Sequence, residues 1–267
     1  GLLPHIKAMN RTALDQYEGL VTDALKSCSA KLRKSFKTAF IQLMILYMVL
    51  PRKINFTQMG RYSDSSEQRF RQLFEREFDW MQFNLFLMRQ RFGESVRKAI
   101  AIDASYISKS GKKTPYIGKF WSGCASQVKR GLEILGIGII DIDSRDCMML
   151  RAEQTPDKTY LEKQGEDYNL VDWYLDVLRK HKDRLLRITR YVVADAWFSK
   201  AKFVGEACLL GFHVISRLRD DVALWYAHDG VRTGKRGRPR IKGEKIDFEN
   251  LDLQRCEVLD IEGGRAY

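Results

Sequence analysis

The sequence of 267 residues has few of the residues that build disulfide-bonded or zinc-stabilised domains. Its 5 cysteines are an odd number without a Cys-x-x-Cys pair, and its 4 histidines form no His-Glu-x-x-His motif. This pattern argues against a zinc site and against a disulfide framework. We therefore expect a protein of the reducing cytoplasm.

Prolines and long apolar runs are also scarce. The sequence has only 5 prolines, and its longest apolar run, 39–50, is interrupted by Gln42. That run is shorter than the roughly 18–20 apolar residues that span a bilayer. We expect it to form a buried core helix in a globular protein without a membrane partner.

Acidic residues are too few to balance the basic ones. Asp and Glu number 34 against 46 Lys and Arg, which gives a net charge of +12. An excess of this size favours a polyanionic partner, most simply nucleic acid. A basic protein that binds a membrane surface is the alternative.

The first part of the chain, 1–96, is predicted to be a helical DNA-binding region, because helix formers dominate and apolar residues recur at spacings of three and four. A short helix is expected over 55–62 and a second over 66–78, capped by Asp64 or Ser65. Phe70, Leu73, Phe74 and Phe78 would form the inner side of the second helix.

This pair of helices resembles a helix-turn-helix. Arg69, Gln72 and Arg76 share the outer side of the second helix, where they could reach the major groove of DNA. A solvated face on a packed helical bundle explains the same pattern equally well.

From residue 97 the sequence favours an α/β core, 97–219, with one sheet and flanking helices. Strands are expected over 99–107, 132–142, 147–152, 190–195 and 213–217, with helices over 169–181 and from a Ser199 cap to Leu210. The remainder, 220–267, is polar and glycine-rich and resembles an incomplete β-rich region.

Two acids, Asp103 and Asp195, each follow a run of apolar β-formers. Sites in open α/β sheets lie at the carboxyl ends of such strands. Two carboxylates there would repel by about 4 kcal/mol at about 4 Å with an effective dielectric constant of about 20. A hard divalent cation, Mg²⁺ or Mn²⁺, removes that repulsion and supports phosphodiester chemistry.

A turn or a helix cap is the ordinary role of an Asp at the end of a strand, and the pattern alone leaves that role open. Asp141 and Asp143 compete for the metal-binding role. Asp143 belongs to an expected hairpin turn, and Asp141 lies in a strand that continues to Ile142.

The segments around both acids resemble those of DDE transposases from bacterial insertion sequences. Residues 101–107 and 109–114 are similar to the first-aspartate segment of that family, and 120–124 and 129–133 continue the likeness. Asp195-Ala196-Trp197-Phe198 is similar to the second-aspartate motif, and 211–219 to the strand that follows it. The resemblance covers about 97–245.

The resemblance implies a ribonuclease-H-like core, with Asp103 and Asp195 as catalytic, metal-binding residues for Mg²⁺ (or Mn²⁺). It implies cleavage of double-stranded DNA at terminal inverted repeats, transfer of the freed 3′-hydroxyl into target DNA, and a homodimer in the DNA complex. It also implies a cytoplasmic, nucleoid-associated bacterial protein.

The third acid of the family is a Glu in a Tyr-x-x-Arg-x-x-x-Glu-x-x-x-x-x-x-Lys signature, which this sequence lacks. Glu206 follows Asp195 too closely to take that place. We expect the sequence to be a fragment that stops inside a β-rich insertion, with the third acid beyond residue 267. A fragment of this kind would be catalytically defective.

A basic segment, 232–242, contains Arg236-Gly237-Arg238-Pro239, the pattern of an AT-hook that lies in a narrow minor groove. A flexible charged loop that contacts phosphates is the alternative, and Arg236 and Arg238 would then bind without reading sequence. The family resemblance makes Trp225 a candidate platform for a flipped base.

Further cations follow Asp103 along the chain. Lys112, Lys113, Lys129 and Arg130 could bind the DNA backbone near that acid, or they could be solvated surface charges. Two functional alternatives to the transposase stay open. One is a DNA-binding regulator derived from a transposase, and the other is a metal-dependent nuclease of the same fold.

Overall fold

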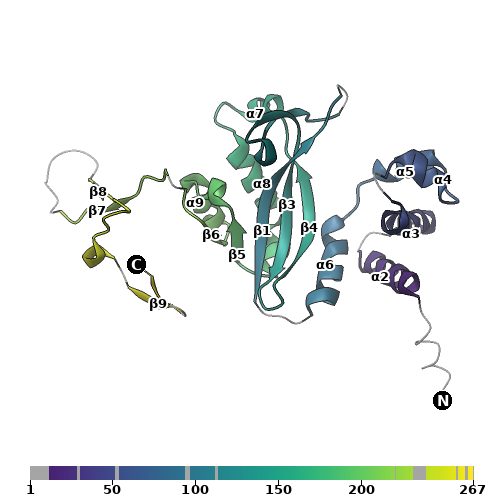
Figure 1. Cartoon of the computed structure of the whole chain (residues 1–267), viewed down its shortest axis with the longest axis horizontal. Helices are drawn as coiled ribbons and strands as arrows, with labels where there is room; N and C mark the ends of the chain where they lie inside the picture. The colour runs from purple at the N-terminus through teal and green to yellow at the C-terminus, as the bar shows by residue number, and fades with distance from the viewer. Residues whose placement is uncertain are drawn as a thin grey trace, which may run out of the picture. The chain divides into compact units, whose positions relative to one another are not determined.

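The computed structural model describes residues 12–28, 31–51, 54–93, 97–111, 114–219, 221–230, 239–256, 258–261 and 264–266 (Figure 1). These belong to two compact units, Gly1–Ser216 and Arg217–Tyr267. Four of the cations singled out in the sequence, Lys112, Lys113, Arg236 and Arg238, lie outside the described residues.

The first unit begins with helices that surround an aromatic core. They are α2 (Ala13–Ser27), α3 (Lys34–Val49), α4 (Phe56–Arg61), α5 (Glu67–Phe74) and α6 (Trp80–Phe92). The apolar run predicted to be a core helix lies in α3, where Phe40 and Leu43 are at most 4% exposed. No helix in the described ranges is long and apolar enough to span a membrane.

The second helix of the expected helix-turn-helix differs from its prediction at both ends. Ser66 caps α5 by accepting a hydrogen bond from the backbone N–H of Arg69 (3.3 Å), so the predicted caps Asp64 and Ser65 were wrong. The helix ends at Phe74, whose side chain is 51% exposed. Phe78 lies after the helix and packs on the aromatic core from a loop.

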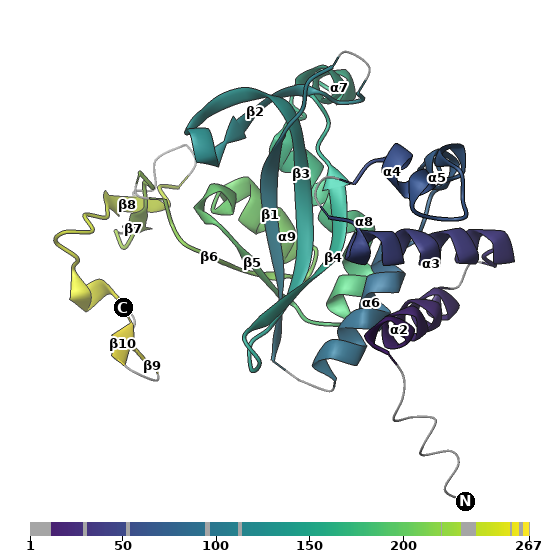
Figure 2. The ribbon, with the colours of Figure 1, turned by 45° about the vertical axis from the view of Figure 1, so that its right-hand side comes forward.

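Helix α6 joins the helical core to the core beneath the sheet (Figure 2). One side of it contributes Phe83 to the aromatic core. Its other side contributes apolar residues to the core beneath the sheet, namely Met81, Leu85, Met88 and Phe92. A helix that is apolar on both sides is buried between two layers, so α6 belongs to both cores.

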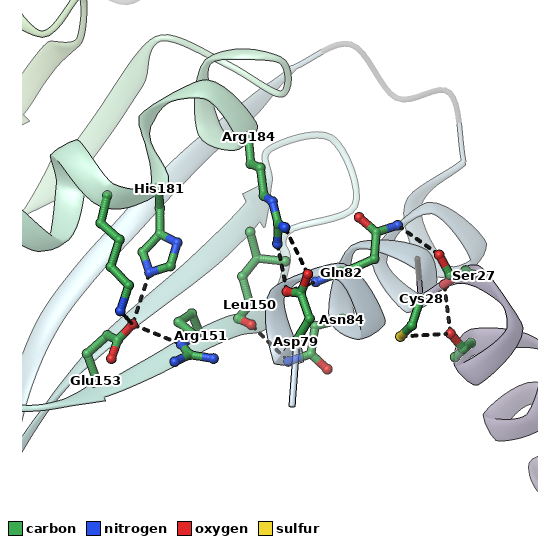
Figure 3. Close-up of polar contacts among 12 residues, drawn as sticks. Ser27, Cys28, Asp79, Gln82, Asn84, Leu150, Arg151, Glu153, His181 and Arg184 are labelled. Atoms are coloured by element: carbon green, nitrogen blue, oxygen red, sulfur yellow. Dashed lines mark hydrogen bonds and ion pairs between the residues drawn. The ribbon is translucent and has the colours of Figure 1, made fainter. Parts of the chain in front are cut away.

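Polar contacts reinforce this junction (Figure 3). Asp79 caps α6 and accepts two hydrogen bonds, of 2.7 and 2.8 Å, from the guanidinium of Arg184. The side-chain amide of Asn84 donates to the carbonyl of Leu150 at 2.9 Å. The helical layer is therefore fixed to the sheet by charge and hydrogen bonding as well as by packing.

The sheet has six strands in the order β2-β3-β1-β5-β6, with β4 also paired to β3. The strands are β1 (Lys98–Ser108), β2 (Gly118–Ser122), β3 (Gln127–Asp141), β4 (Asp146–Gln154), β5 (Tyr191–Ala194) and β6 (His213–Ser216). The β1–β3, β2–β3 and β3–β4 pairs are antiparallel, and the β1–β5 and β5–β6 pairs are parallel. The predicted mixed α/β core, a mixed sheet flanked by helices, is confirmed.

One face of this sheet packs on helices α6, α8 (Leu170–Leu186) and α9 (Ala201–Leu209). Strand residues on that face are at most 3% exposed, as in Ile100, Ile102, Ile137, Ile139 and Val192. The strand register places Met149, Tyr191 and Ile215 on the opposite face, where they are 52–55% exposed. Among the described residues, the helices thus cover one face of the sheet.

Three local features depart from the sequence prediction. Strand β2 and helix α7 (Lys158–Gln164) were not predicted. Helix α9 starts after Lys200 without a side-chain cap, because the Ser199 hydroxyl donates to the carbonyl of Ala196 at 2.8 Å instead. Gly211 adopts a φ of +96° where the chain leaves α9, in agreement with its predicted role at the end of that helix.

The second unit contains two small antiparallel sheets. One pairs β7 (Trp225–Ala227) with β8 (Lys242–Lys245), and the other pairs β9 (Leu259–Ile261) with β10 (Gly264–Ala266). The guanidinium of Arg255 lies 4.2 Å from the ring centroid of Tyr226. Short strands of this kind agree with the predicted β-rich character of the region.

Candidate active site

The parallel pairing of β1 with β5 brings Asp103 and Asp195 together. Ile102 lies opposite Ala194 in the register, and each acid is the residue that follows this last pair. Neighbouring strands lie about 4.8 Å apart, and both side chains line the same cleft. The β1 strand runs on to Ser108, so Asp103 marks the point where its pairing with β5 ends rather than the end of the strand.

Asp195 also shapes the backbone around it. Its carboxylate accepts a hydrogen bond from the backbone N–H of Trp197 at 3.0 Å and so caps the short 3₁₀ turn Ala196–Phe198. Its carbonyl accepts one from the hydroxyl of Ser216 at 2.7 Å. The capping role that the sequence left open is therefore present, and it fixes the carboxylate at the mouth of the cleft.

The proximity of the two acids affects the pKa of Asp103. Although this side chain reaches solvent, partial burial and the negative charge of Asp195 raise the pKa of its carboxyl above the ordinary value, against hydrogen bonds from Ala104 and Ser105 that lower it. Ionised Asp103 is thus less favourable in the folded chain than in the unfolded chain.

We expect Asp103→Asn to raise the free energy of unfolding at neutral pH, because it removes this unfavourable charge. The gain should be present above the raised folded pKa and disappear as the pH falls below about 3.9, where both states are protonated. Urea unfolding at several pH values measures it, with the exposed Asp183→Asn on α8 as the control. A loss of stability at neutral pH would contradict the assigned electrostatics.

The cleft beside the two acids has a volume of about 540 Å³. Its walls are largely aromatic, formed by Phe120, Trp121, Tyr174, Trp197 and Phe198. An acidic edge beside aromatic walls can bind a cation and a planar group next to each other.

A third carboxylate, Glu133, lines the cleft and was missed as a site residue in the sequence. It is 7% exposed and accepts a hydrogen bond from the Tyr174 hydroxyl at 2.6 Å. Burial, and then the charge of Glu133, raise the pKa of Tyr174, so this phenol stays a donor. An acid at an inward position of the apolar run Leu132–Leu135 was the signal that could have found it.

The oxygen donors fit a hard divalent cation, because Asp103 and Asp195 present two carboxylates from neighbouring strands. Nowhere in the described ranges do three His, Cys, Asp or Glu side chains gather closely enough to hold a metal ion. Glu133, which accepts the hydrogen bond from Tyr174, does not complete such a group of three with Asp103 and Asp195. The candidate metal site therefore consists of two carboxylates, those of Asp103 and Asp195.

The two competing acids have structural roles at the β3–β4 turn. Asp141 is 2% exposed, and its Oδ1 accepts hydrogen bonds from the backbone N–H groups of Asp143 and Ser144 at 3.0 and 2.9 Å. Asp143 forms an ion pair with Arg97 at 3.2 Å. Neither acid lines the cleft of Asp103 and Asp195.

Two predicted DNA-binding cations, Lys129 and Arg130, lie on β3. Lys129 lines a second cleft, of about 790 Å³, that Asp195 also lines. Arg130 donates a hydrogen bond to the carbonyl of Gly111 at 3.2 Å and lies opposite Lys119 of β2. The structure thus places Lys129 in a cleft shared with Asp195, whereas Arg130 lines neither cleft.

The other predicted DNA contacts lie elsewhere. Arg69 is half-buried, and its guanidinium donates to the carbonyl of Ser35 at 2.9 Å, which ties α5 to the start of α3. Trp225 lies in the second unit, is 41% exposed, and has the ammonium of Lys242 3.9 Å from its ring centroid. Each side chain therefore already has a partner within its own unit.

Known structures give distant similarities. The chain is 14% identical to a Mos1 transposase paired-end complex with left transposon end, covering 80% of this chain and 75% of that chain at a TM-score of 0.23. A Mos1 mariner paired-end complex with Mn is 12% identical, with coverages of 71% and 61% and a TM-score of 0.20. A pre-cleavage Mos1 transpososome is 11% identical, with coverages of 81% and 76% and a TM-score of 0.17.

No curated protein sequence matches the chain. The family comparison is more specific, because residues 33–262 match the model of the DDE superfamily endonucleases. This match includes the sheet, Asp103, Asp195 and most of the helical layer. The chain therefore belongs to the DDE superfamily endonucleases.

Proposed function

We propose that the protein is the transposase of an insertion sequence, which binds terminal inverted repeats and catalyses DNA strand cleavage and strand transfer. The observation that carries this proposal is the register of β1 and β5, which brings Asp103 and Asp195 to one cleft in a DDE endonuclease. The net charge of +12 supports DNA as the partner.

Asp103 and Asp195 would hold Mg²⁺ or Mn²⁺ where the pairing of β1 with β5 ends. When bound, such a cation activates a water or a 3′-hydroxyl and stabilises the leaving oxygen of a phosphodiester. Lys129 would bind the DNA backbone beside Asp195, and Arg130 would bind it farther along β3. The turn capped by Asp195 keeps its carboxylate in place, and Tyr174 keeps the buried Glu133 hydrogen-bonded.

We further propose that these 267 residues on their own bind DNA without cutting it, because cleavage and strand transfer would need a third metal-binding acid besides Asp103 and Asp195. The described residues gather no group of three metal-ligating side chains, and one buried acid in the cleft is already committed to Tyr174. The same observation favours the second candidate function, a DNA-binding regulator derived from a transposase. Nicked product in an assay with labelled DNA and Mn²⁺ would count against both statements.

The test of the proposed site is the affinity for a labelled DNA duplex with and without a divalent cation. Without the cation, the two carboxylates repel the phosphate, and we expect Mn²⁺ to tighten binding by about tenfold. Asp103→Asn and Asp195→Asn should each bind more tightly than the wild type in EDTA and lose the response to Mn²⁺. Fluorescence anisotropy at constant ionic strength measures both effects.

Asp183→Asn is the matched control, since it removes one exposed acid from α8. It should keep the wild-type response to Mn²⁺. A response that survives in Asp103→Asn would contradict the metal role of the pair. Absence of duplex binding at low salt would contradict the DNA-binding function as a whole.

A further inference from the structure

Glu133 is a carboxylate at a position where burial is unfavourable for one. It is 7% exposed on β3, and Leu135 and Ile137, which follow it on the same face of the strand, are 0% exposed. Taking a carboxylate out of water costs more free energy than one hydrogen bond returns. An apolar side chain of similar size would pack there at lower cost, so stability of the fold does not account for this acid.

The partner of this acid is the hydroxyl of Tyr174. It donates to Oε1 of Glu133 at 2.6 Å, and Tyr174 is itself 1% exposed. The backbone of Glu133 is fixed as well, because the N–H of Thr155 donates to its carbonyl at 2.9 Å. A short hydrogen bond to a charged group, between two buried side chains, holds both of them in one geometry. Tyr174 is therefore anchored to β3 at its hydroxyl end.

The ring of Tyr174 lies against the turn that follows Asp195. Its centroid is 5.4 Å from that of Trp197 and 5.3 Å from that of Phe198. Both rings belong to the 3₁₀ turn Ala196–Phe198, and the N–H of Trp197 donates to the carboxylate of Asp195 at 3.0 Å. A shift of the Tyr174 ring would therefore move the turn, and the carboxylate of Asp195 with it.

Asp103 is positioned by a different part of the fold. It lies within β1, where Gly136 of β3 is its partner in the register. Hydrogen bonds from Ala104 and Ser105, the next two residues of the strand, reach its carboxyl. The position of Asp103 thus follows from the pairing of the sheet, whereas that of Asp195 depends on a turn packed against α8.

We infer that Tyr174, anchored by Glu133, is a positioning residue for Asp195 in the candidate metal site. This inference rests on the proposed function, and it explains why the cleft contains a buried acid paired with a phenol. A metal site needs ligand oxygens that are held to within about 0.5 Å. Residues that orient a ligand change metal affinity by about 10- to 100-fold when they bond to it directly. The link from Tyr174 runs through a turn, so its effect is smaller.

The test measures how much Tyr174→Phe weakens Mn²⁺ binding in the wild type, in Asp103→Asn and in Asp195→Asn. Phenylalanine keeps the ring and removes only the hydroxyl. We expect a loss of about three- to tenfold in the wild type and in Asp103→Asn. In Asp195→Asn the factor should be about one, because the carboxylate that Tyr174 positions is already absent. The electron paramagnetic resonance signal of free Mn²⁺ measures each affinity.

Tyr168→Phe is the matched control. The hydroxyl of Tyr168 also donates to a carboxylate, that of Asp176, at 2.8 Å, and neither residue lines the cleft of the two acids. This variant should leave the affinity for Mn²⁺ unchanged, because it removes the same kind of hydrogen bond at a place that does not support the turn.

A second variant serves if Tyr174→Phe does not fold because Glu133 is left without its donor. Tyr174→Phe combined with Glu133→Met removes donor and acceptor together, which a buried site tolerates better. Because it also removes a charge, its losses in Asp103→Asn and in Asp195→Asn are compared as a ratio. That ratio should be about three or more.

Three results would overturn the inference. They are equal losses in Asp103→Asn and Asp195→Asn, an unchanged affinity in the wild-type background, and a loss in Tyr168→Phe as large as that in Tyr174→Phe. Equal losses would show that Tyr174 only stabilises the fold. A wild-type chain that binds no Mn²⁺ would instead overturn the proposed metal site, and the inference with it.

Discussion

Replacing Phe40 with alanine is expected to lower the free energy of unfolding by about 3–5 kcal/mol. The side chain is 2% exposed at the centre of the helical layer. Its ring contacts Phe36, Phe78, Trp80 and Phe83 at centroid distances of 5.8, 4.9, 5.6 and 5.4 Å. Alanine would leave a cavity bordered by rigid rings, which cannot collapse to fill it.

Urea unfolding followed by circular dichroism measures this loss. Phe74→Ala is the matched control, because its ring is 51% exposed and contacts Phe56 alone among the described rings. We expect that control to cost about 1 kcal/mol or less. Equal losses for the two variants would show that the aromatic layer is not the core of the helical part.

Replacing Glu153 with glutamine is expected to cost about 2–3 kcal/mol at neutral pH. Burial alone would raise the pKa of this carboxyl, but hydrogen bonds from His181, Arg151 and Lys180 outweigh burial and hold the pKa at about 2 (Figure 3). The three donors lie 3.0, 3.0 and 3.1 Å from one carboxylate oxygen and join β4 to α8. Glutamine keeps the shape of the side chain and removes its charge.

The pH dependence of this loss follows from the direction of the shift. Because the folded pKa is depressed, the stabilisation is fully present above the ordinary pKa of glutamic acid, about 4.3, and disappears as the pH falls toward 2. The difference between wild type and Glu153→Gln should therefore vanish in acid. Urea midpoints at several pH values measure it.

Glu162→Gln is the control for this experiment. Glu162 pairs with Lys158 at 3.3 Å, but the two side chains are 62% and 88% exposed. An ion pair this exposed contributes about 0–1 kcal/mol. A loss for Glu153→Gln that is no larger, or that persists unchanged into acid, would contradict the proposed role of the cluster.

The central sheet could be predicted because several of its strands coincide with short apolar runs in the sequence. The run before Asp103 became β1 and the run before Asp195 became β5, and parallel neighbours place the following residues at one edge. The meeting of the two acids was thus predictable from the sequence pattern, given the α/β fold. The pairing partners follow from topology, which a single sequence does not display.

Features that depend on tertiary contacts could not be predicted in the same way. Strand β2 is short and carries Lys119 and Trp121 outward, so no alternating apolar pattern marks it. The role of Glu133 depends on a hydrogen bond from Tyr174, which lies on helix α8, far along the chain.

The roles of individual cations could not be predicted from the sequence either. Arg69 has the sequence signature of a DNA contact, yet its guanidinium donates to the backbone of α3. Composition shows that positive charge is in excess, but not which cations the fold itself uses. Contacts within the folded chain decide that distribution.

Binding of Mn²⁺ itself tests the shared site most directly, by the loss of the electron paramagnetic resonance signal of the free ion as protein is added. We expect Asp103→Asn and Asp195→Asn each to weaken the tightest site by about tenfold or more. The double variant should bind the ion more weakly than either single one, because it removes both carboxylates from one ion. Asp183→Asn should match the wild type. Unchanged affinity in either single variant would contradict a shared cation site.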